Sequence, residues 1–418
     1  MQIGIIGLGD MGKLYARTFA KAGYVVYGSD LEQLNQQLRE EMQPQGVVVL
    51  ANGYEVARRS DLLIFCVEAE FIGNVVQTYA NSVKYGAVVS GQTSVKSPEI
   101  DAFERYLSTD VQIVTCHSLH GPAFETEGQT LIIIRHRASD ESYHKVYRVY
   151  ETLKSKIIEM DDYKRHDQIM ADTQAITHMG FESMGSAWKN AGFYPWENAA
   201  YTNGIDNVKI LTTLRIFSYK SHIYAGLAIL NPYARKQVRM YAKAEAELFK
   251  LMICEDELGF RNLIESAKTF IFSKQSRPLL LNDEVMKEFR FSNSTHPAKV
   301  NSHLSILSMV YAWYKMEINP YDSLICQTPP FRLRLGIAEY LFKNDEMLEE
   351  SIRAALYDKS IRADDLEFHT AVHEWASLIE YGDMKGYKEH FEAAKNFFSE
   401  RLENGLRQSS EMISRFAD

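Results

Sequence analysis

Short apolar runs alternate with amphipathic stretches over about the first 160 residues. This alternation is typical of a parallel sheet wrapped by helices, since each buried strand is followed by a helix that returns the chain to the same edge of the sheet. We predict eight strands, with the sequences QIGIIG, YVVYGS, GVVVL, DLLIFCV, GAVVSG, VQIVTC, TLIIIR and KIIEM. SPEIDAFERYL predicts a helix with Ser97 as N-cap, Pro98 as first helical residue and Glu99 as a first-turn acid.

The strand signal fades after residue 160, and apolar residues then recur three and four positions apart, as in helices that face a core. Examples are DQIMADTQAITHMGFESMGSAW, YARKQVRMYAKAEAELFKLMI, NSHLSILSMVYAWYKM and DLEFHTAVHEWASLIEYG. The pattern predicts an α/β domain over residues 1–160 and a mainly α-helical domain over residues 161–418. A chain of 418 residues is long for one core, so its length agrees with two domains.

The formal net charge of −9 argues against nucleic acid and membrane surfaces as partners, because both attract a basic protein surface. An anionic substrate must therefore be bound by a few local Arg or Lys side chains. No apolar stretch approaches the ~20 residues that span a bilayer, and MQIGIIGLGD leads straight into a strand without the features of a signal or transit peptide. We expect a cytoplasmic protein.

The four cysteines are widely spaced and form no CxxC pair, which indicates neither a zinc site nor a disulfide framework. A reducing compartment fits this usage best. The His, Asp and Glu residues show no metal-ligand spacing either, so we expect no metal site.

A glycine-rich turn follows the first strand and opens a helix. It reads Gly7-Leu8-Gly9-Asp10-Met11-Gly12, a GxGxxG pattern. In this position the glycines allow a tight turn, close approach of the backbone to a pyrophosphate, and close packing of helix on strand, with the phosphates at the positive helix N-terminus. The first domain is therefore predicted to be a Rossmann-type dinucleotide-binding domain.

Asp30 ends the second strand, where an acidic residue usually binds the hydroxyls of the adenosine ribose. This placement favours NAD, because a 2′-phosphate would need a nearby Arg or Lys and the next three residues, Leu-Glu-Gln, offer none. The alternative is that Asp30 caps the helix that follows.

Two polar side chains follow neighbouring strands of the predicted sheet. Ser94 comes after the fifth strand, and His117 lies at the end of the sixth. Ligands bind beyond the carboxyl ends of the strands in such a sheet, so both side chains should reach the cofactor crevice. A serine and a histidine there suit proton handling beside a hydride transfer.

Several stretches resemble prephenate dehydrogenase, an enzyme of tyrosine biosynthesis, and in particular its fungal type. The resemblance runs over nearly the whole chain, through GIIGLGDMG, GQTSVKSPEI, HSLHGP, HDQIMADTQAITH, SMGSAW, TLRIFSYKSHIYAGLAI, NSHLS and NPYDSLICQTP. Together these stretches are far more specific than the glycine pattern alone.

The resemblance implies roles for the residues at the strand ends. The family's catalytic histidine stands in an H-x-x-x-G context, which here selects His117, followed by Gly121. His120 lies at the third variable position and is expected to be structural or peripheral. The family's Ser-Val-Lys turn matches Ser94 and the two residues after it, which implies that this serine lies near the nicotinamide and orients the histidine.

The resemblance also implies a carboxylate-binding arginine in the helical domain. A T-R-I-type stretch carries it in the family and matches Arg215 here. Arginine suits this task because its planar fork binds a carboxylate through two hydrogen bonds. An ordinary surface salt bridge is the alternative for Arg215, and Arg332 is the next candidate for the substrate carboxylate.

A His-Asp helix of the family matches His166 and leads to His178, but Gln174 and Ala175 replace the Ser-His pair of bacterial members. His178 is a candidate substrate-binding residue, with a hydrogen-bonded buried histidine as the alternative.

The implied reaction is oxidative decarboxylation of prephenate to 4-hydroxyphenylpyruvate, with hydride transfer to NADP in fungal relatives. Asp30 keeps NAD open, and arogenate remains open as a substrate. The family's helical domain also implies a homodimer. Two other readings are a 6-phosphogluconate-type or β-hydroxyacid dehydrogenase and a catalytically silent NADP-binding module. The first relies on a helical lysine that is not matched here, and the second should show a decayed site.

Overall fold

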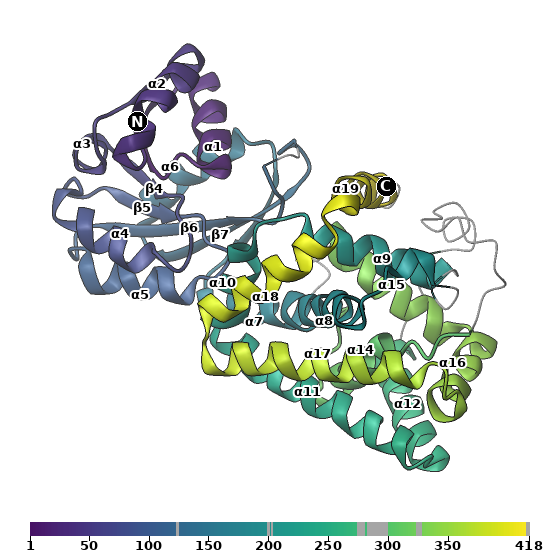
Figure 1. Ribbon diagram of the computed structural model, residues 1–418. Coiled ribbons are helices and arrows are strands. Elements are labelled where there is room, and N and C mark those ends of the chain that lie inside the picture. The colour runs from purple at the N-terminus through teal and green to yellow at the C-terminus, as the bar shows by residue number, and fades with distance from the viewer. Residues whose placement is uncertain are drawn as a thin grey trace. The chain divides into compact units, whose positions relative to one another are not determined.

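The computed structural model describes residues 1–122, 125–198, 201, 204–273, 281, 300–322 and 328–414. The chain forms two compact units, Met1–Gln168 and Ile169–Asp418, drawn in Figure 1 from purple to blue and from teal to yellow. The sequence placed a boundary after residue 160, whereas the contacts divide the chain within helix α7, Tyr163–Met170. No helix among the described residues is long and apolar enough to cross a membrane.

One eight-stranded sheet organises the first unit, in the order β3-β2-β1-β4-β5-β6-β7-β8. Strands β1 to β6 are parallel to one another, β7 runs antiparallel to β6, and β8 is parallel to β7. All eight strands predicted from the sequence are present. Their bounds are β1 Gln2–Ile6, β2 Val25–Ser29, β3 Val47–Val49, β4 Leu62–Phe65, β5 Val88–Gly91, β6 Gln112–Ser118, β7 Thr130–Arg137 and β8 Lys156–Met160.

Helices cover both faces of this sheet because successive strand residues point to opposite sides. Ile3 and Ile5 of β1 pack toward α1, α2 and α6, whereas Leu63 and Phe65 of β4 pack toward α3, α4 and α5 (Figure 1). These helices are α1 Asp10–Lys21, α2 Asn35–Met42, α3 Gly53–Arg59, α4 Ile72–Tyr79, α5 Ser97–Tyr106 and α6 Asp140–Glu151.

The start of α5 differs from the predicted cap. Ser97 is the first helical residue, not the N-cap, and Lys96 precedes it without a side-chain cap. The Ser97 hydroxyl donates to the Asp167 carboxylate at 2.6 Å, while the backbone N–H groups of Lys96 and Ser97 donate to the same carboxylate at 2.7 Å each. A carboxylate from far along the chain therefore satisfies this helix N-terminus.

The second unit is helical in its described residues and surrounds one large apolar core. Helix α8 lies at its centre, with α9, α14, α17 and α18 around it (Figure 1). The helices are α8 Ile176–Ala191, α9 Gly204–Phe217, α10 Ser221–Leu230, α11 Pro232–Ile253, α12 Glu257–Phe272, α14 Leu304–Lys315, α15 Pro329–Lys343, α16 Asp345–Tyr357, α17 Arg362–Tyr381, α18 Met384–Phe397 and α19 Leu402–Ser414.

A π-helical turn, Ala171–Ala175, joins α7 to α8. Such turns are rare and are frequent at functional sites. Gln174 and Ala175, which replace the Ser-His pair of bacterial relatives, both lie in this turn. The departure from the family pattern thus coincides with a local change in helix geometry.

Candidate active site

The glycines of the first turn have different structural reasons. Gly7 has a φ of +96°, and a Cβ there would lie 2.4 Å from the carbonyl oxygen of Cys66. A Cβ on Gly12 would lie 2.0 Å from the carbonyl oxygen of Gly7. At Gly9, by contrast, a Cβ would meet no atom of the described structure within 4 Å beyond its chain neighbours. The fold requires Gly7 and Gly12, whereas Gly9 leaves open space.

This open space lies at the N-terminus of α1, where Gly9 is the N-cap and no side chain caps the helix. Asp10 and the half-buried Met11 form the first helical turn. Unpaired backbone N–H groups and the helix dipole attract an anion at such an end. The residues present therefore fit the pyrophosphate of a dinucleotide.

Asp30 ties the end of β2 to the glycine turn. One carboxylate oxygen accepts the Leu8 N–H at 2.5 Å, and the other accepts the Leu31 N–H at 2.7 Å. Neither the short helix at 32–34 nor α2 has a side-chain cap, so the alternative that Asp30 caps the next helix is wrong. Its two backbone contacts give Asp30 a structural role whichever nucleotide is bound.

His117, at the end of β6, belongs to a chain of three side chains. Its Nδ1 lies 2.9 Å from Nε2 of His166, and Nδ1 of His166 lies 2.9 Å from Oδ1 of Asp167. His166 and Asp167 come from α7, within the first unit. His117 is 8% exposed, whereas His166 and Asp167 are fully buried.

The hydrogen bonds determine which nitrogens carry protons. An ionised carboxylate only accepts, so Nδ1 of His166 donates to Asp167 and Nε2 of His166 has a free lone pair. Nδ1 of His117 must then donate to that lone pair. Nε2 of His117 is left as an acceptor, with no protein partner among the described residues. The chain therefore orients a neutral imidazole as a hydrogen-bond acceptor.

The local electrostatics agree with this assignment. Burial, followed by the charges of His166, Lys96 and His120, holds the pKa of His117 well below its usual value. Burial also lowers the pKa of His166, although Asp167 opposes the shift. For Asp167, burial disfavours ionisation, but the hydrogen bonds that it accepts outweigh burial and lower its pKa. The result is two neutral imidazoles against one carboxylate.

A buried ion pair braces the backbone behind His117. Lys96 and Glu99 are both fully buried, with Nζ and Oε1 3.1 Å apart. Nζ also donates to the carbonyl oxygen of Cys116 at 2.6 Å and to the Thr115 hydroxyl at 3.1 Å. The same lysine thus connects the loop after β5 to the end of β6. Sequence reasoning did not single out this pair.

The expected orientation of His117 by Ser94 is not what the structure shows. Ser94 is half-buried in the loop between β5 and α5, and His166 holds the His117 ring instead. A role for Ser94 beside the nicotinamide stays a prediction. The Nδ1 atom of His120 contacts the carbonyl oxygen of Gly121 at 3.0 Å, while its Nε2 is buried and unpaired among the described residues.

His178 and Arg215 lie in the helical unit. His178 is half-buried on α8, and its ring meets Tyr224 edge-on at 4.9 Å. Burial and the charge of Arg334 lower the pKa of His178 well below its usual value, so the ring is neutral.

Arg215, on α9, is 4% exposed, which excludes the alternative of an ordinary surface salt bridge. Its guanidinium donates to the hydroxyls of Ser410 at 2.9 Å and Tyr219 at 3.0 Å. These neutral hydroxyls orient the guanidinium.

A second buried arginine stands beside this group. Arg334 on α15 is 3% exposed, donates to the Thr177 hydroxyl at 3.0 Å, and lies over the Phe181 ring at 5.5 Å. Its Nε is buried without a partner among the described residues. Burial lowers its pKa to about 10, with Arg215 contributing, so it stays protonated at neutral pH. The sequence had pointed to Arg332, two residues earlier, as the second candidate.

One buried carboxylate balances part of this charge. Glu182, one turn after His178 on α8, accepts the Tyr387 hydroxyl at 2.8 and 2.9 Å. Burial raises its pKa to about 7, against the lowering effects of Tyr387 and Arg334. The centre of the helical unit therefore holds two arginines, a neutral histidine and a carboxylate that titrates near neutrality.

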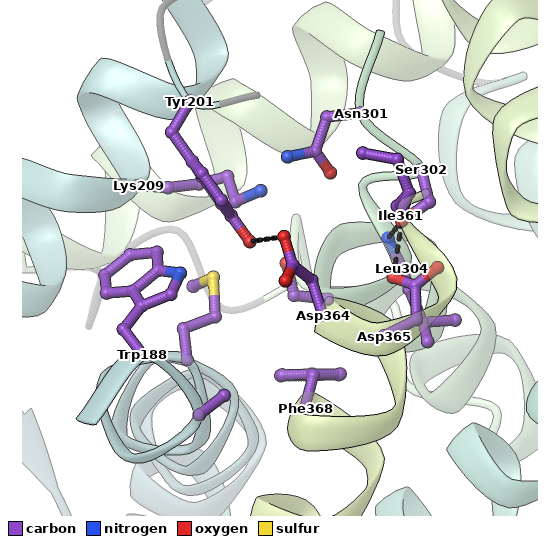
Figure 2. Close-up of a pocket in the computed structure, with 13 residues that line it drawn as sticks. Trp188, Tyr201, Lys209, Asn301, Ser302, Leu304, Ile361, Asp364, Asp365 and Phe368 are labelled. Atoms are coloured by element: carbon purple, nitrogen blue, oxygen red, sulfur yellow. Dashed lines mark hydrogen bonds between the residues drawn. The ribbon is translucent and has the colours of Figure 1, made fainter. Parts of the chain in front are cut away.

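Figure 2 shows a separate cavity in the same unit, lined by Trp188, Tyr201, Lys209, Asp364 and other residues. The Tyr201 hydroxyl donates to Asp364 at 3.4 Å. The cavity has a volume of about 30 Å³, enough for two or three waters at ~10–15 Å³ each. Ligand pockets are about ten times larger, so this cavity in its present form is not a substrate site.

Comparisons with known proteins cover the whole chain. Residues 175–418 match a family described as a 6-phosphogluconate dehydrogenase C-terminal domain, and residues 2–92 match NADP oxidoreductase coenzyme F420-dependent. Prephenate dehydrogenase [NADP(+)] of Saccharomyces cerevisiae is 45% identical over 98% of this chain and 93% of its own length. The chain belongs to the prephenate dehydrogenase family.

Further relatives agree with this membership. A probable prephenate dehydrogenase [NADP(+)] of Schizosaccharomyces pombe is 42% identical over 100% of this chain and 98% of its own length. A crystal structure of prephenate dehydrogenase from A. aeolicus superposes with a TM-score of 0.51 at 15% identity, covering 63% of this chain and 95% of that one. The latter likeness shows the shared fold of the prephenate dehydrogenase family.

The glycine turn generates the first prediction. Gly9→Ala should leave the melting temperature unchanged, because its Cβ enters open space, but should weaken dinucleotide binding at least about tenfold by crowding the pyrophosphate. Gly12→Ala should destabilise the fold, because its Cβ overlaps the Gly7 carbonyl oxygen. Calorimetry and fluorescence titration with NADP and NAD measure both effects. Unchanged nucleotide affinity of Gly9→Ala would contradict the assignment.

The buried ion pair generates the second. Lys96→Met leaves the Glu99 charge uncompensated, which should cost about 3–5 kcal/mol and lower the melting temperature by roughly 6–20 °C. Lys84→Met breaks an exposed pair with Asp61 and should cost less than about 1 kcal/mol. The double variant with Glu99→Met should be more stable than Lys96→Met alone. Equal losses in the buried and the exposed variants would disprove the bracing role.

Proposed function

We propose that this chain oxidatively decarboxylates prephenate to 4-hydroxyphenylpyruvate with NADP as hydride acceptor, a step of tyrosine biosynthesis. The observation that carries the proposal is the neutral His117, held by His166 and Asp167 with its Nε2 as an acceptor. The full-length relatives named as NADP(+)-dependent prephenate dehydrogenases support the substrate and the cofactor.

His117 acts on the ring hydroxyl of the substrate. Its Nε2 accepts the hydroxyl hydrogen, so electron density moves toward the oxygen as the hydride leaves the carbinol carbon. The bond to the ring carboxylate breaks, CO₂ departs, and its electron pair makes the ring aromatic. When bound, NADP supplies the hydride acceptor.

The rest of the chain supports the charge that develops on His117. As Nε2 gains positive character, the Nδ1–H bond to His166 strengthens, and His166 is held in turn by the Asp167 carboxylate. The carboxylate is itself oriented by two backbone N–H groups and a hydroxyl at the start of α5. Such preorganised support requires little rearrangement during the reaction.

Two arginines suit a substrate with two carboxylates. We assign Arg215 and Arg334 to the carboxylates of prephenate, with the neutral His178 as a hydrogen-bonding neighbour. The assignment rests on their burial in an otherwise apolar unit and on the unpaired Nε of Arg334 among the described residues. A planar guanidinium binds a carboxylate through two parallel hydrogen bonds, which a lysine cannot reproduce.

The NADP assignment no longer conflicts with Asp30. The carboxylate of Asp30 is engaged by the glycine turn and by Leu31, so its presence has a structural reason besides ribose binding. Ser94 beside the nicotinamide and assembly as a homodimer are further expectations of the proposal.

His117 generates the third prediction. His117→Asn should lower kcat by about 10²–10⁴ with little effect on ligand affinity, as expected for a positioned acid–base group. In the unmodified enzyme kcat should fall at acid pH, because imidazolium cannot accept the proton. Since burial lowers the pKa of His117, this fall should begin below the usual histidine value. The pH profile of kcat measures both effects.

Asp167→Asn tests the support of His117. It keeps an acceptor for His166 but removes the negative charge, so kcat should fall and the acid limb should move to lower pH. His120→Asn is the control and should change kcat much less. An unaltered acid limb in both His117→Asn and Asp167→Asn would remove the chain from the mechanism.

The arginines generate the fourth prediction. Arg215→Gln and Arg334→Gln should each raise KM for prephenate roughly 30- to 150-fold, the equivalent of about 2–3 kcal/mol for a lost charge-assisted contact. Cofactor affinity should not change. Arg334→Lys should recover only part of the loss, and Arg332→Gln, two residues away, is the matched control. If Arg332→Gln raises KM and Arg334→Gln does not, the second candidate named from the sequence is right.

A further inference from the structure

Two histidines of α17 and one glutamate of α11 form a cluster that the proposed reaction does not use. The Nδ1 atom of His369 lies 2.7 Å from Oε2 of Glu245, and Nε2 of His373 lies 3.9 Å from the same oxygen. One ligand atom from each residue lies within 4.8 Å of the other two. The histidines are four residues apart, so they share one face of their helix.

The cluster is anchored in the protein and open on one side. Glu245 is fully buried, whereas the side chain of His369 is 25% exposed and that of His373 is 46% exposed. Phe249 stacks on the His369 ring at 4.4 Å with an interplanar angle of 11°, which orients the imidazole. All these residues lie on two long helices that pack against each other, a rigid support for a binding site.

Glu245 supplies a second, independent observation. Its Oε1 is buried and accepts no hydrogen bond from the described residues. Buried carboxylate oxygens normally have partners, so an unpaired one needs an explanation. A cation held beside the carboxylate would provide it.

We propose that Glu245, His369 and His373 bind a divalent transition-metal ion, most naturally zinc. Two imidazole nitrogens and one carboxylate oxygen suit zinc or copper, whereas magnesium and calcium prefer oxygen ligands alone. In a tetrahedral site with bonds of ~2.0–2.1 Å the ligand atoms are roughly 3.3 Å apart. The present separations of 2.7 and 3.9 Å bracket this value, so small side-chain movements complete the site.

The competing interpretation is a simple ion pair between Glu245 and a protonated His369. That pair explains the 2.7 Å contact but gives His373 no role and leaves Oε1 of Glu245 without a partner among the described residues. A metal ion engages all three residues, crosslinks α11 to α17, and leaves a coordination position on the solvent side. Sequence analysis had expected no metal site because the His-x-x-x-His spacing gains meaning only when a facing glutamate is known.

Titration of the untagged full-length chain with zinc tests the proposal. The protein is stripped with a chelator and then competes for Zn²⁺ with a chromophoric indicator. We expect one zinc ion per chain, bound at micromolar concentration or below, and a higher melting temperature with zinc than without. Cobalt in place of zinc should give visible absorption bands typical of a tetrahedral site.

The variants separate the two interpretations. His369→Gln and His373→Gln should each weaken zinc binding at least about tenfold and abolish the thermal shift, with prephenate turnover unchanged. His390→Gln is the control, because His390 faces a single carboxylate, Glu374, at 3.6 Å. Absence of zinc binding by the unmodified chain, or full affinity in His373→Gln, would overturn the proposal.

Discussion

A buried carboxylate is destabilising unless its lone pairs are used, and Asp167 meets that condition in a way on which the active site depends. It accepts from the start of α5 on one side and from His166 on the other. One charge therefore closes a helix end, determines the tautomer of two imidazoles and aims His117. The position of the catalytic group follows from the need to satisfy a helix terminus.

The helical unit handles buried charge differently. Arg215 and Arg334 are almost fully buried, yet the partners described above are mainly hydroxyls and an aromatic ring. Glu182, with a pKa raised to about 7, adds only partial compensation. An anionic ligand beside Arg334 would improve the charge balance, which gives physical content to substrate binding in this unit. The cavity in Figure 2 is too small to take that role.

Periodicity predicted the elements well, because a buried parallel strand and a core-facing helix each impose their own repeat on apolar residues. It was less reliable at the ends of elements. Ser97 was read as an N-cap from local sequence, but Asp167, seventy residues later, performs the capping. A side chain that distant leaves no trace in the local pattern, so a polar residue before a proline was given the wrong role.

The sequence by itself determined the glycine turn, the eight strands and the placement of His117, since a motif and a strand end are local features of the chain. Its resemblance to the prephenate dehydrogenase family added Arg215 and His178. Only the tertiary structure decided that His166 rather than Ser94 holds His117, that Asp30 is tied to the glycine turn, and that Arg334 is buried near His178. It also brought Glu245 to His369 across 124 residues. These are contacts between distant segments, and their partners are chosen by packing and by the need to pair buried charge, neither of which is written in local spacing.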